Sequence, residues 1–300
     1  MTARAPLIIA GACGYGCWPD NSLEGFARSL DAGVDGVEVD VHLSADGHVV
    51  LYHDYRLDPH RTRRDGAWIN APGPVLKSLT VDELRRYDVG RAQTGSKYER
   101  EHPHQQPMDS VTIGTLSEAL GLLRAAGHDE QIYIEIKTTP QEPNLSSDPN
   151  ALSAAVLEQL SRADLLGRAR VIAFDWRVLR TLRTMRPELA TSHLSIPPAL
   201  QKQIKRSEDG HSPWADGCDP VLFAGSVPRA IAAHGGQCWS AHFSELSDDN
   251  IAEAKAAGLA VAAWGLSRAE DIEGFYSKGL ESLTVSGPYW GAHIDRRKGG

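Results

Sequence analysis

The sequence has few cysteines, no long apolar run and no excess of basic residues. Its four cysteines, at positions 13, 17, 218 and 238, are too few and too scattered for a disulfide scaffold. No apolar run approaches the ~18 residues of a membrane span, and the apolar stretch 6–12 is predicted to be a first strand, not a signal peptide. The net charge of −8 disfavours a nucleic-acid partner. We therefore expect a cytoplasmic protein without a transmembrane segment.

Apolar runs typical of strands alternate with helical patterns over most of the 300 residues, without a break in composition. This order predicts one domain over residues 1–300, an α/β fold of the TIM (β/α)8 barrel type. About nine candidate strands compete for the eight barrel positions of that fold. We therefore expect one of them to be a hairpin arm or a false assignment.

Residues 55–110 interrupt the alternation after the third strand. They are polar and irregular, with one helix predicted over Val81–Tyr87. A long segment of this kind within a compact domain is usually an inserted subdomain or an active-site cover. We predict that it is an insertion that shapes specificity.

The strand 37–43 carries polar groups on one face. Its alternation places Glu38, Asp40 and His42 side by side, and two carboxylates this close are costly unless a cation lies between them. The next apolar run, Val49–Tyr52, ends at His53. The pattern suits a metal-dependent acid–base site, whereas the alternative is a surface strand with its charges facing water.

A second alternating strand, 131–137, places Glu135 and Lys137 on one face at its carboxyl end. In a TIM barrel the active site lies at the carboxyl ends of the strands. The residues that fall at or near such ends are Glu38, Asp40, His53, Glu135, Lys137, Asp175 and Trp264. Two alternatives stay open, since Lys137 could only pair with Glu135, and Trp264 could belong to the aromatic core instead of a ligand pocket.

Several segments, in this order along the chain, resemble the glycerophosphodiester phosphodiesterase family, within the wider group of phosphatidylinositol phospholipase C-like TIM barrels. They are Pro19–Ser22 with Phe26, Gly33–Val41, Asp46–Gly47 with His53–Asp54, Leu79–Leu84, Leu116–Leu120, Glu135–Lys137, Phe174–Asp175, and Ala256–Leu259 running to Trp264.

The resemblance implies a metal-dependent phosphodiesterase acting on a small phosphorylated substrate. Glu38, Asp40 and Glu135 would bind a divalent cation, Mg²⁺ or Ca²⁺, and Lys137 would contact the phosphate. His53 would be one of two acid–base histidines, and Trp264 is a candidate for the wall of the substrate pocket. The chemistry agrees, because a hard cation and a lysine neutralise phosphoryl oxygens and histidine transfers protons near neutral pH.

The sequence also departs from the family pattern. The family's first strand ends in His-Arg-Gly, where this chain has Gly11-Ala12-Cys13-Gly14. The aspartate after the last strand is also missing from Thr284-Val285-Ser286. We favour a divergent phosphodiesterase-like enzyme that keeps His53, with Tyr15, Cys13 or a substrate group as the second proton donor.

Three alternatives remain open. One is a lyase or cyclisation reaction on a phosphorylated metabolite, which would need only one proton-transferring group. Another is a non-catalytic protein that binds a phosphorylated ligand. The third is a deliberately altered sequence. The sequence gives no indication of the oligomeric state.

Overall fold

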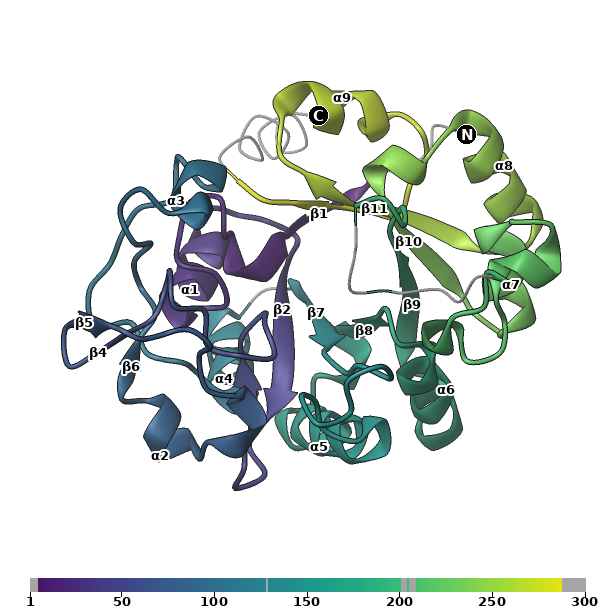
Figure 1. Cartoon of the computed structure of the whole chain (residues 1–300). Helices are drawn as coiled ribbons and strands as arrows, with labels where there is room; N and C mark the ends of the chain where they lie inside the picture. The colour runs from purple at the N-terminus through teal and green to yellow at the C-terminus, as the bar shows by residue number, and fades with distance from the viewer. Residues whose placement is uncertain (1–4, 128, 201–203, 205–208, 288–300) are drawn as a thin grey trace.

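The computed structural model describes residues 5–127, 129–200, 204 and 209–287 (Figure 1). Eight parallel strands follow one another around a closed barrel, because β1 pairs with both β12 and β2. They are β1 (Leu7–Ala10), β2 (Gly36–Leu43), β7 (Gln131–Ile136), β8 (Ala169–Ala173), β9 (Ala190–Ser195), β10 (Cys238–His242), β11 (Ala260–Leu266) and β12 (Ser282–Val285). The predicted TIM barrel is confirmed.

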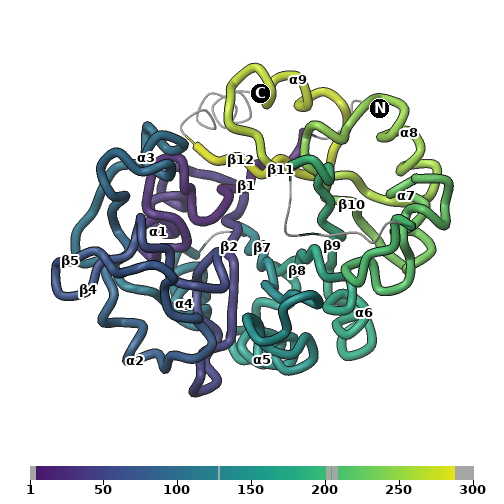
Figure 2. The backbone as a smooth tube through the Cα atoms, viewed as in Figure 1, coloured from purple at the N-terminus to yellow at the C-terminus, as the bar shows by residue number. Residues whose placement is uncertain are grey.

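Helices surround the barrel (Figures 1 and 2). Those that follow barrel strands or the insertion are α1 (Leu23–Asp31), α4 (Leu116–Ala126), α5 (Pro149–Ala163), α6 (Trp176–Met185), α7 (Val227–Ala233), α8 (Asp248–Ala256) and α9 (Ala269–Tyr276). Local sequence sets their starts: Ser22 caps α1, and Thr115 forms a capping box with Glu118 at the start of α4. Short 3₁₀ turns are η1 (Gly11–Cys13), η2 (Leu76–Ser78), η3 (Leu166–Arg168), η4 (Pro213–Ala215), η5 (Pro220–Phe223) and η6 (Phe243–Glu245).

The ninth strand of the sheet is a hairpin arm. Strand β3 (Val49–Leu51) runs antiparallel to β2, with Val41 opposite Leu51. The connection between β2 and β3 is too short for the helical crossover that a parallel neighbour needs, and Gly47 takes a positive φ of 83° in the turn. The ninth candidate strand expected from the sequence is therefore this hairpin arm.

The insertion after β3 has secondary structure and an apolar cluster of its own. It contains β4 (Arg63–Arg64), β5 (Ala67–Trp68), β6 (Tyr87–Asp88), α2 (Val81–Leu84) and α3 (Lys97–Glu101). The helix predicted over Val81–Tyr87 ends earlier, at Leu84, because Tyr87 pairs with Arg64 in the small sheet. The bounds 1–300 for one domain and 55–110 for a cover stay predictions.

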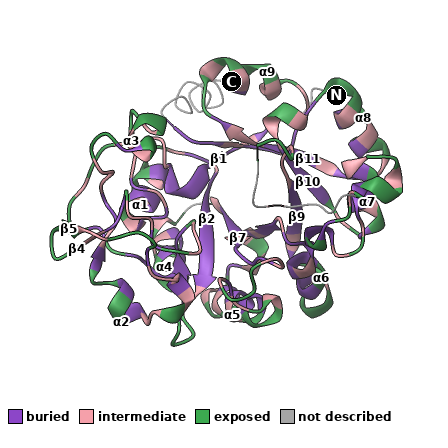
Figure 3. Cartoon of the chain, in the orientation of Figure 1, coloured by how far each residue is buried: buried purple, intermediate pink, exposed green. Residues whose placement is uncertain are grey.

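The floor of the barrel is packed with side chains. Ile9, Tyr133, Ile172 and Leu194 form one buried cluster inside it, and Phe174 is among the residues packed against them. Most residues of the barrel strands are buried (Figure 3). The strands meet unevenly, since β1 pairs with β2 at only two positions whereas β2 pairs with β7 at six. Among the described helices, none combines the length and apolar composition needed to cross a bilayer.

Candidate active site

Three carboxylates gather at the carboxyl ends of β2 and β7. Glu38 and Asp40 share the inner face of β2 through its two-residue period. The register between the strands then places Glu135 of β7 directly opposite Asp40. Ligand oxygens of the three side chains lie within 4.8 Å of one another. Residues predicted separately on two strands therefore form one cluster that could hold a metal ion.

Glu38 is buried beside two other carboxylates, which makes its charged form unfavourable. Burial, followed by the charges of Asp40 and Glu135, raises the pKa of Glu38 well above its usual value. Its Oε2 accepts a hydrogen bond from the Ala12 amide at 2.6 Å, whereas its buried Oε1 has no hydrogen-bond partner among the described residues. A buried carboxylate oxygen without a partner beside two other acids is a suitable cation ligand.

Lys137 pairs with two of the three acids. Its Nζ lies 2.8 Å from Oε1 of Glu135 and 3.3 Å from Oδ1 of Asp40. Burial lowers the pKa of Lys137, but the two carboxylates outweigh burial and raise it well above its usual value. The ion pair with Glu135 considered from the sequence is therefore present. Lys137 also lines the larger of two cavities described below, so it stays available to a ligand.

His53 is held at the edge of the cluster by its neighbour in sequence. Its Nδ1 donates to Oδ1 of Asp54 at 2.8 Å, which leaves Nε2 for the cavity. Lys137 and burial lower the pKa of His53, but Asp40 and Asp54 outweigh them, so that its pKa is raised. Just over half of the His53 side chain, 54%, is exposed. The geometry suits a proton-transferring group with a fixed orientation.

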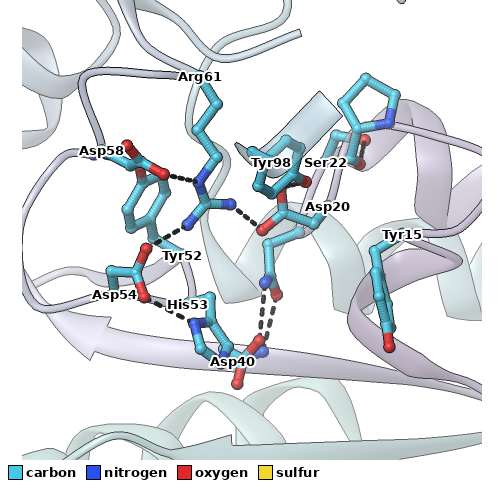
Figure 4. Close-up of polar contacts among 12 residues, drawn as sticks. Tyr15, Asp20, Ser22, Asp40, Tyr52, His53, Asp54, Asp58, Arg61 and Tyr98 are labelled. Atoms are coloured by element: carbon cyan, nitrogen blue, oxygen red, sulfur yellow. Dashed lines mark hydrogen bonds and ion pairs between the residues drawn. The ribbon is translucent and has the colours of Figure 1, made fainter. Parts of the chain in front are cut away.

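A buried arginine from the insertion continues this chain of contacts (Figure 4). Arg61 pairs with Asp54 at 2.8 Å and with Asp20. Its guanidinium also stacks over Tyr52, 4.5 Å from the ring centre. Burial alone would raise the pKa of Asp54, but Arg61 and His53 hold it well below its usual value. The residue pattern gave Arg61 no role, because no local period links it to the barrel.

Two cavities meet at the acidic cluster, and Glu38, His53, Glu135 and Trp264 line both. The larger, about 610 Å³, extends past Lys137 over an apolar wall. That wall includes Phe174, Leu194, Ile196 and Trp214. The smaller, about 360 Å³, lies beside Gly11 and Ala12 under the insertion. In it lie Tyr15, Asp20, Arg61, Tyr98 and His102.

The remaining sequence candidates have different surroundings. Trp264 packs edge-on against Phe174 and His242, and its Nε1 donates to the Ser195 carbonyl at 3.2 Å. Its substrate contact stays a prediction. His42 is buried, and burial, then the charge of Lys137, lowers its pKa to about 4. Asp175 caps α6 by accepting from the Arg177 amide and does not join the cluster of acids.

The closed TIM barrel places its clustered carboxylates and a histidine at the carboxyl ends of its strands, which is where TIM-barrel enzymes have their active sites. Residues 14–286 match the model of the glycerophosphoryl diester phosphodiesterase family, and the chain belongs to that family.

Solved structures and curated proteins agree with this placement. A crystal structure of a putative glycerophosphoryl diester phosphodiesterase from Silicibacter pomeroyi is similar at a TM-score of 0.83 and 29% identity, over 98% of this chain and 94% of that one. A glycerophosphodiester phosphodiesterase of Caldanaerobacter subterraneus is 24% identical over 94% of both chains. The uncharacterised Mycobacterium tuberculosis protein Rv2277c is 33% identical over a stretch of 166 residues. That stretch is 55% of this chain and 48% of the length of that protein.

One structural neighbour holds a small phosphorylated product. An Oleispira antarctica phosphodiesterase in complex with sn-glycerol-3-phosphate has a TM-score of 0.68 and 20% identity, covering 97% of each chain. At this identity the likeness concerns the fold.

Proposed function

We propose that the protein is a metal-dependent phosphodiesterase that hydrolyses glycerophosphodiesters or closely related phosphorylated molecules. One observation carries the proposal: three clustered carboxylates, one with a buried unpartnered oxygen, face a cavity beside a histidine of fixed orientation. Family membership supports it, because related proteins of Caldanaerobacter subterraneus and Oleispira antarctica are named as phosphodiesterases. The four cysteines are all free, which suits the reducing cytoplasm as its location.

The carboxylates of Glu38, Asp40 and Glu135 would hold the divalent cation. Their oxygen-only donor set is of the kind that both Mg²⁺ and Ca²⁺ bind. When bound, such a cation supplies positive charge that stabilises phosphoryl oxygens in the transition state. The unpartnered Oε1 of Glu38 fits this role, since a buried carboxylate oxygen needs either a hydrogen bond or a cation.

The other residues act on the substrate directly or through a neighbour. Lys137 binds a phosphoryl oxygen through its ammonium group, at the wall of the larger cavity. Nε2 of His53 accepts the proton of the attacking water, because Asp54 holds the opposite ring nitrogen as a donor. Trp264 closes one side of the pocket.

The test is ³¹P NMR of the purified protein with glycerophosphodiesters and lysophospholipids, with Mg²⁺, with Ca²⁺ and after chelation. We expect monoester product only with a cation, and a loss of about 10²–10⁴-fold in rate for His53→Ala. Because Asp54 acts through His53, Asp54→Asn added to His53→Ala should cost almost nothing further. A cyclic phosphate would indicate cyclisation, and cation binding without any turnover would contradict the proposal in favour of a binding role.

A further inference from the structure

Hydrolysis of a phosphodiester with an alkoxide leaving group involves two proton transfers, one from the attacking water and one to the leaving oxygen. His53 accounts for the first under the proposed function, on which this inference rests. We infer that the Tyr15 hydroxyl performs the second, acting as the general acid on the leaving oxygen. Tyr15 would then be a catalytic residue supplied by the loop after β1.

Tyr15 occupies the space beside Gly11, which has no side chain. A Cβ atom placed on Gly11 would lie 3.6 Å from Cε1 of Tyr15, the ring carbon next to the one that bears the hydroxyl. Tyr15 lines the smaller cavity together with Glu38, Asp40 and His53. In the view of Figure 4, Tyr15 and Asp54 lie to either side of Asp40, and His53 lies next to Asp40. Tyr15 and His53 therefore line one cavity at the acidic cluster, as an acid and a base that act on the same substrate require.

The surroundings keep the Tyr15 hydroxyl protonated. Burial, with smaller contributions from Glu38 and Asp40, raises its pKa, whereas a hydrogen bond with Ser286 opposes the rise. A protonated phenol beside a phosphoryl site is a competent donor to a developing alkoxide, which is far more basic than a phenolate.

The insertion and the last strand hold the Tyr15 loop in place. Nε2 of Gln105 donates to the Tyr15 carbonyl at 2.7 Å, and the His102 ring packs edge-on against the Tyr15 ring at 5.3 Å. On the other side, the Gly16 amide donates to the Ser286 carbonyl at 2.5 Å. A donor fixed from two sides needs little reorganisation during the reaction.

Other groups near the smaller cavity are less suitable. Cys13 is fully buried within the apolar core. Asp20 already accepts from Arg61 and from Tyr98. His102 donates through Nδ1 to the Tyr98 carbonyl and its ring is stacked on Tyr98 at 4.1 Å, which leaves Nε2 as the rival donor that the test below includes.

The step balances without any further reactant. Nε2 of His53 takes a proton from water while the water oxygen bonds to phosphorus. The bond from phosphorus to the leaving oxygen breaks, and that oxygen takes the proton of the Tyr15 hydroxyl. After the alcohol and the monoester leave, the proton on His53 returns to the Tyr15 phenolate through solvent.

The test compares two esters of glycerol 3-phosphate, with ethanolamine or with 4-nitrophenol as the leaving group. The nitrophenolate needs no proton to leave. For Tyr15→Phe we expect kcat/KM to fall by about 10²–10⁴-fold on the ethanolamine ester, with almost no change on the nitrophenyl ester. Tyr133→Phe, which removes a hydroxyl from the barrel floor, is the matched control and should leave both rates unchanged.

Each other outcome counts against the inference. Equal losses on both esters would show that Tyr15 only binds or supports structure. If kcat/KM falls on the ethanolamine ester alone in His102→Gln but not in Tyr15→Phe, His102 and not Tyr15 is the general acid. Wild-type protein inactive on both esters would overturn the proposed function and this inference with it. If Tyr15→Phe does not fold, wild-type rates on a series of substituted phenyl esters decide, because a steep dependence on leaving-group acidity contradicts proton donation.

Discussion

Asn21 contacts Asp40 at two points. Nδ2 of Asn21 donates to Oδ2 of Asp40 at 2.8 Å, and its Oδ1 accepts the backbone N–H of Asp40 at 2.8 Å. Both residues are buried. The amide therefore fixes the orientation of one carboxylate of the acidic cluster from the loop that precedes α1.

Asn21→Ala should weaken cation binding, because outer partners that orient a ligand commonly contribute 10–100-fold in affinity. We expect a rise of roughly that size in the dissociation constant for Mg²⁺ or Ca²⁺, measured by titration calorimetry. Asn250→Ala is the control, since the side chain of Asn250, on α8, donates to the Glu245 carbonyl and is not part of the acidic cluster. Unchanged affinity in Asn21→Ala would refute the orienting role.

Arg61→Met should destabilise the protein strongly. The substitution keeps the apolar stem but leaves the buried carboxylate of Asp20 without its cation and removes one of the two partners of Asp54. Breaking a buried pair in this way costs about 3–5 kcal/mol. Arg91→Met is the matched control, because its ion pair with Asp109 is exposed and should contribute far less. Urea denaturation of the two variants measures the difference, and equal midpoints would contradict the prediction.

Two buried histidines away from the site predict a pH dependence of stability. Nε2 of His193 lies 2.9 Å from Nδ1 of His234, whose Nε2 donates to Asp216. Burial, then the charge of His234, lowers the pKa of His193. Burial also lowers the pKa of His234, although Asp216 opposes it. Below the ordinary histidine pKa of about 6.5, the unfolded chain therefore binds protons that the folded chain does not.

The free energy of unfolding should consequently fall as pH drops below about 6.5, by up to roughly 1.4 kcal/mol per pH unit for each of the two histidines. Above about pH 7 this contribution is constant. Chemical denaturation at pH 7.5, 6.5 and 5.5 measures the slope, and the double variant His193→Gln, His234→Gln should show a shallower one. Parallel curves for the two proteins would exclude the pair as the cause.

Gly16→Ala should disturb the Tyr15 loop. A Cβ atom there would lie 1.9 Å from the Ser286 carbonyl oxygen, which is backbone and cannot rotate away. We expect a loss of about 1–3 kcal/mol, as for other overpacked positions. Gly121→Ala, on an open face of α4, should instead gain a few tenths to about 1 kcal/mol. Thermal melts of both variants test the contrast, which fails if Gly16→Ala melts like the wild type.

The sequence predicted the barrel and the acidic cluster because both depend on short periods. A period of two placed Glu38 and Asp40 on one face, and the common carboxyl edge of a parallel sheet brought Glu135 near them. One surplus strand was expected, but its pairing was not resolved from the sequence; the structure shows that it is the antiparallel arm after β2, where the connection is too short for a crossover.

The insertion could not be predicted in the same way. Arg61 lies 41 residues from Asp20 along the chain, and Tyr98 lies 78 residues from it. No repeating pattern links such positions, because an irregular segment is placed by its tertiary contacts and not by its period. The same reason explains the predicted helix that ends at Leu84, where pairing of Tyr87 in a small sheet overrides local propensity.

The short pairing between β1 and β2 ties closure of the barrel to the site above it. Only Ile9 with Gly36 and Ala10 with Val37 pair there, and the next contact across the same boundary is the Ala12 amide on Glu38. Local opening of this boundary would separate Glu38 from the Ala12 amide that donates to it. Amide hydrogen exchange at Ala12 would therefore report on the assembly of the site, and a ligand that orders Glu38 would slow exchange along the whole boundary.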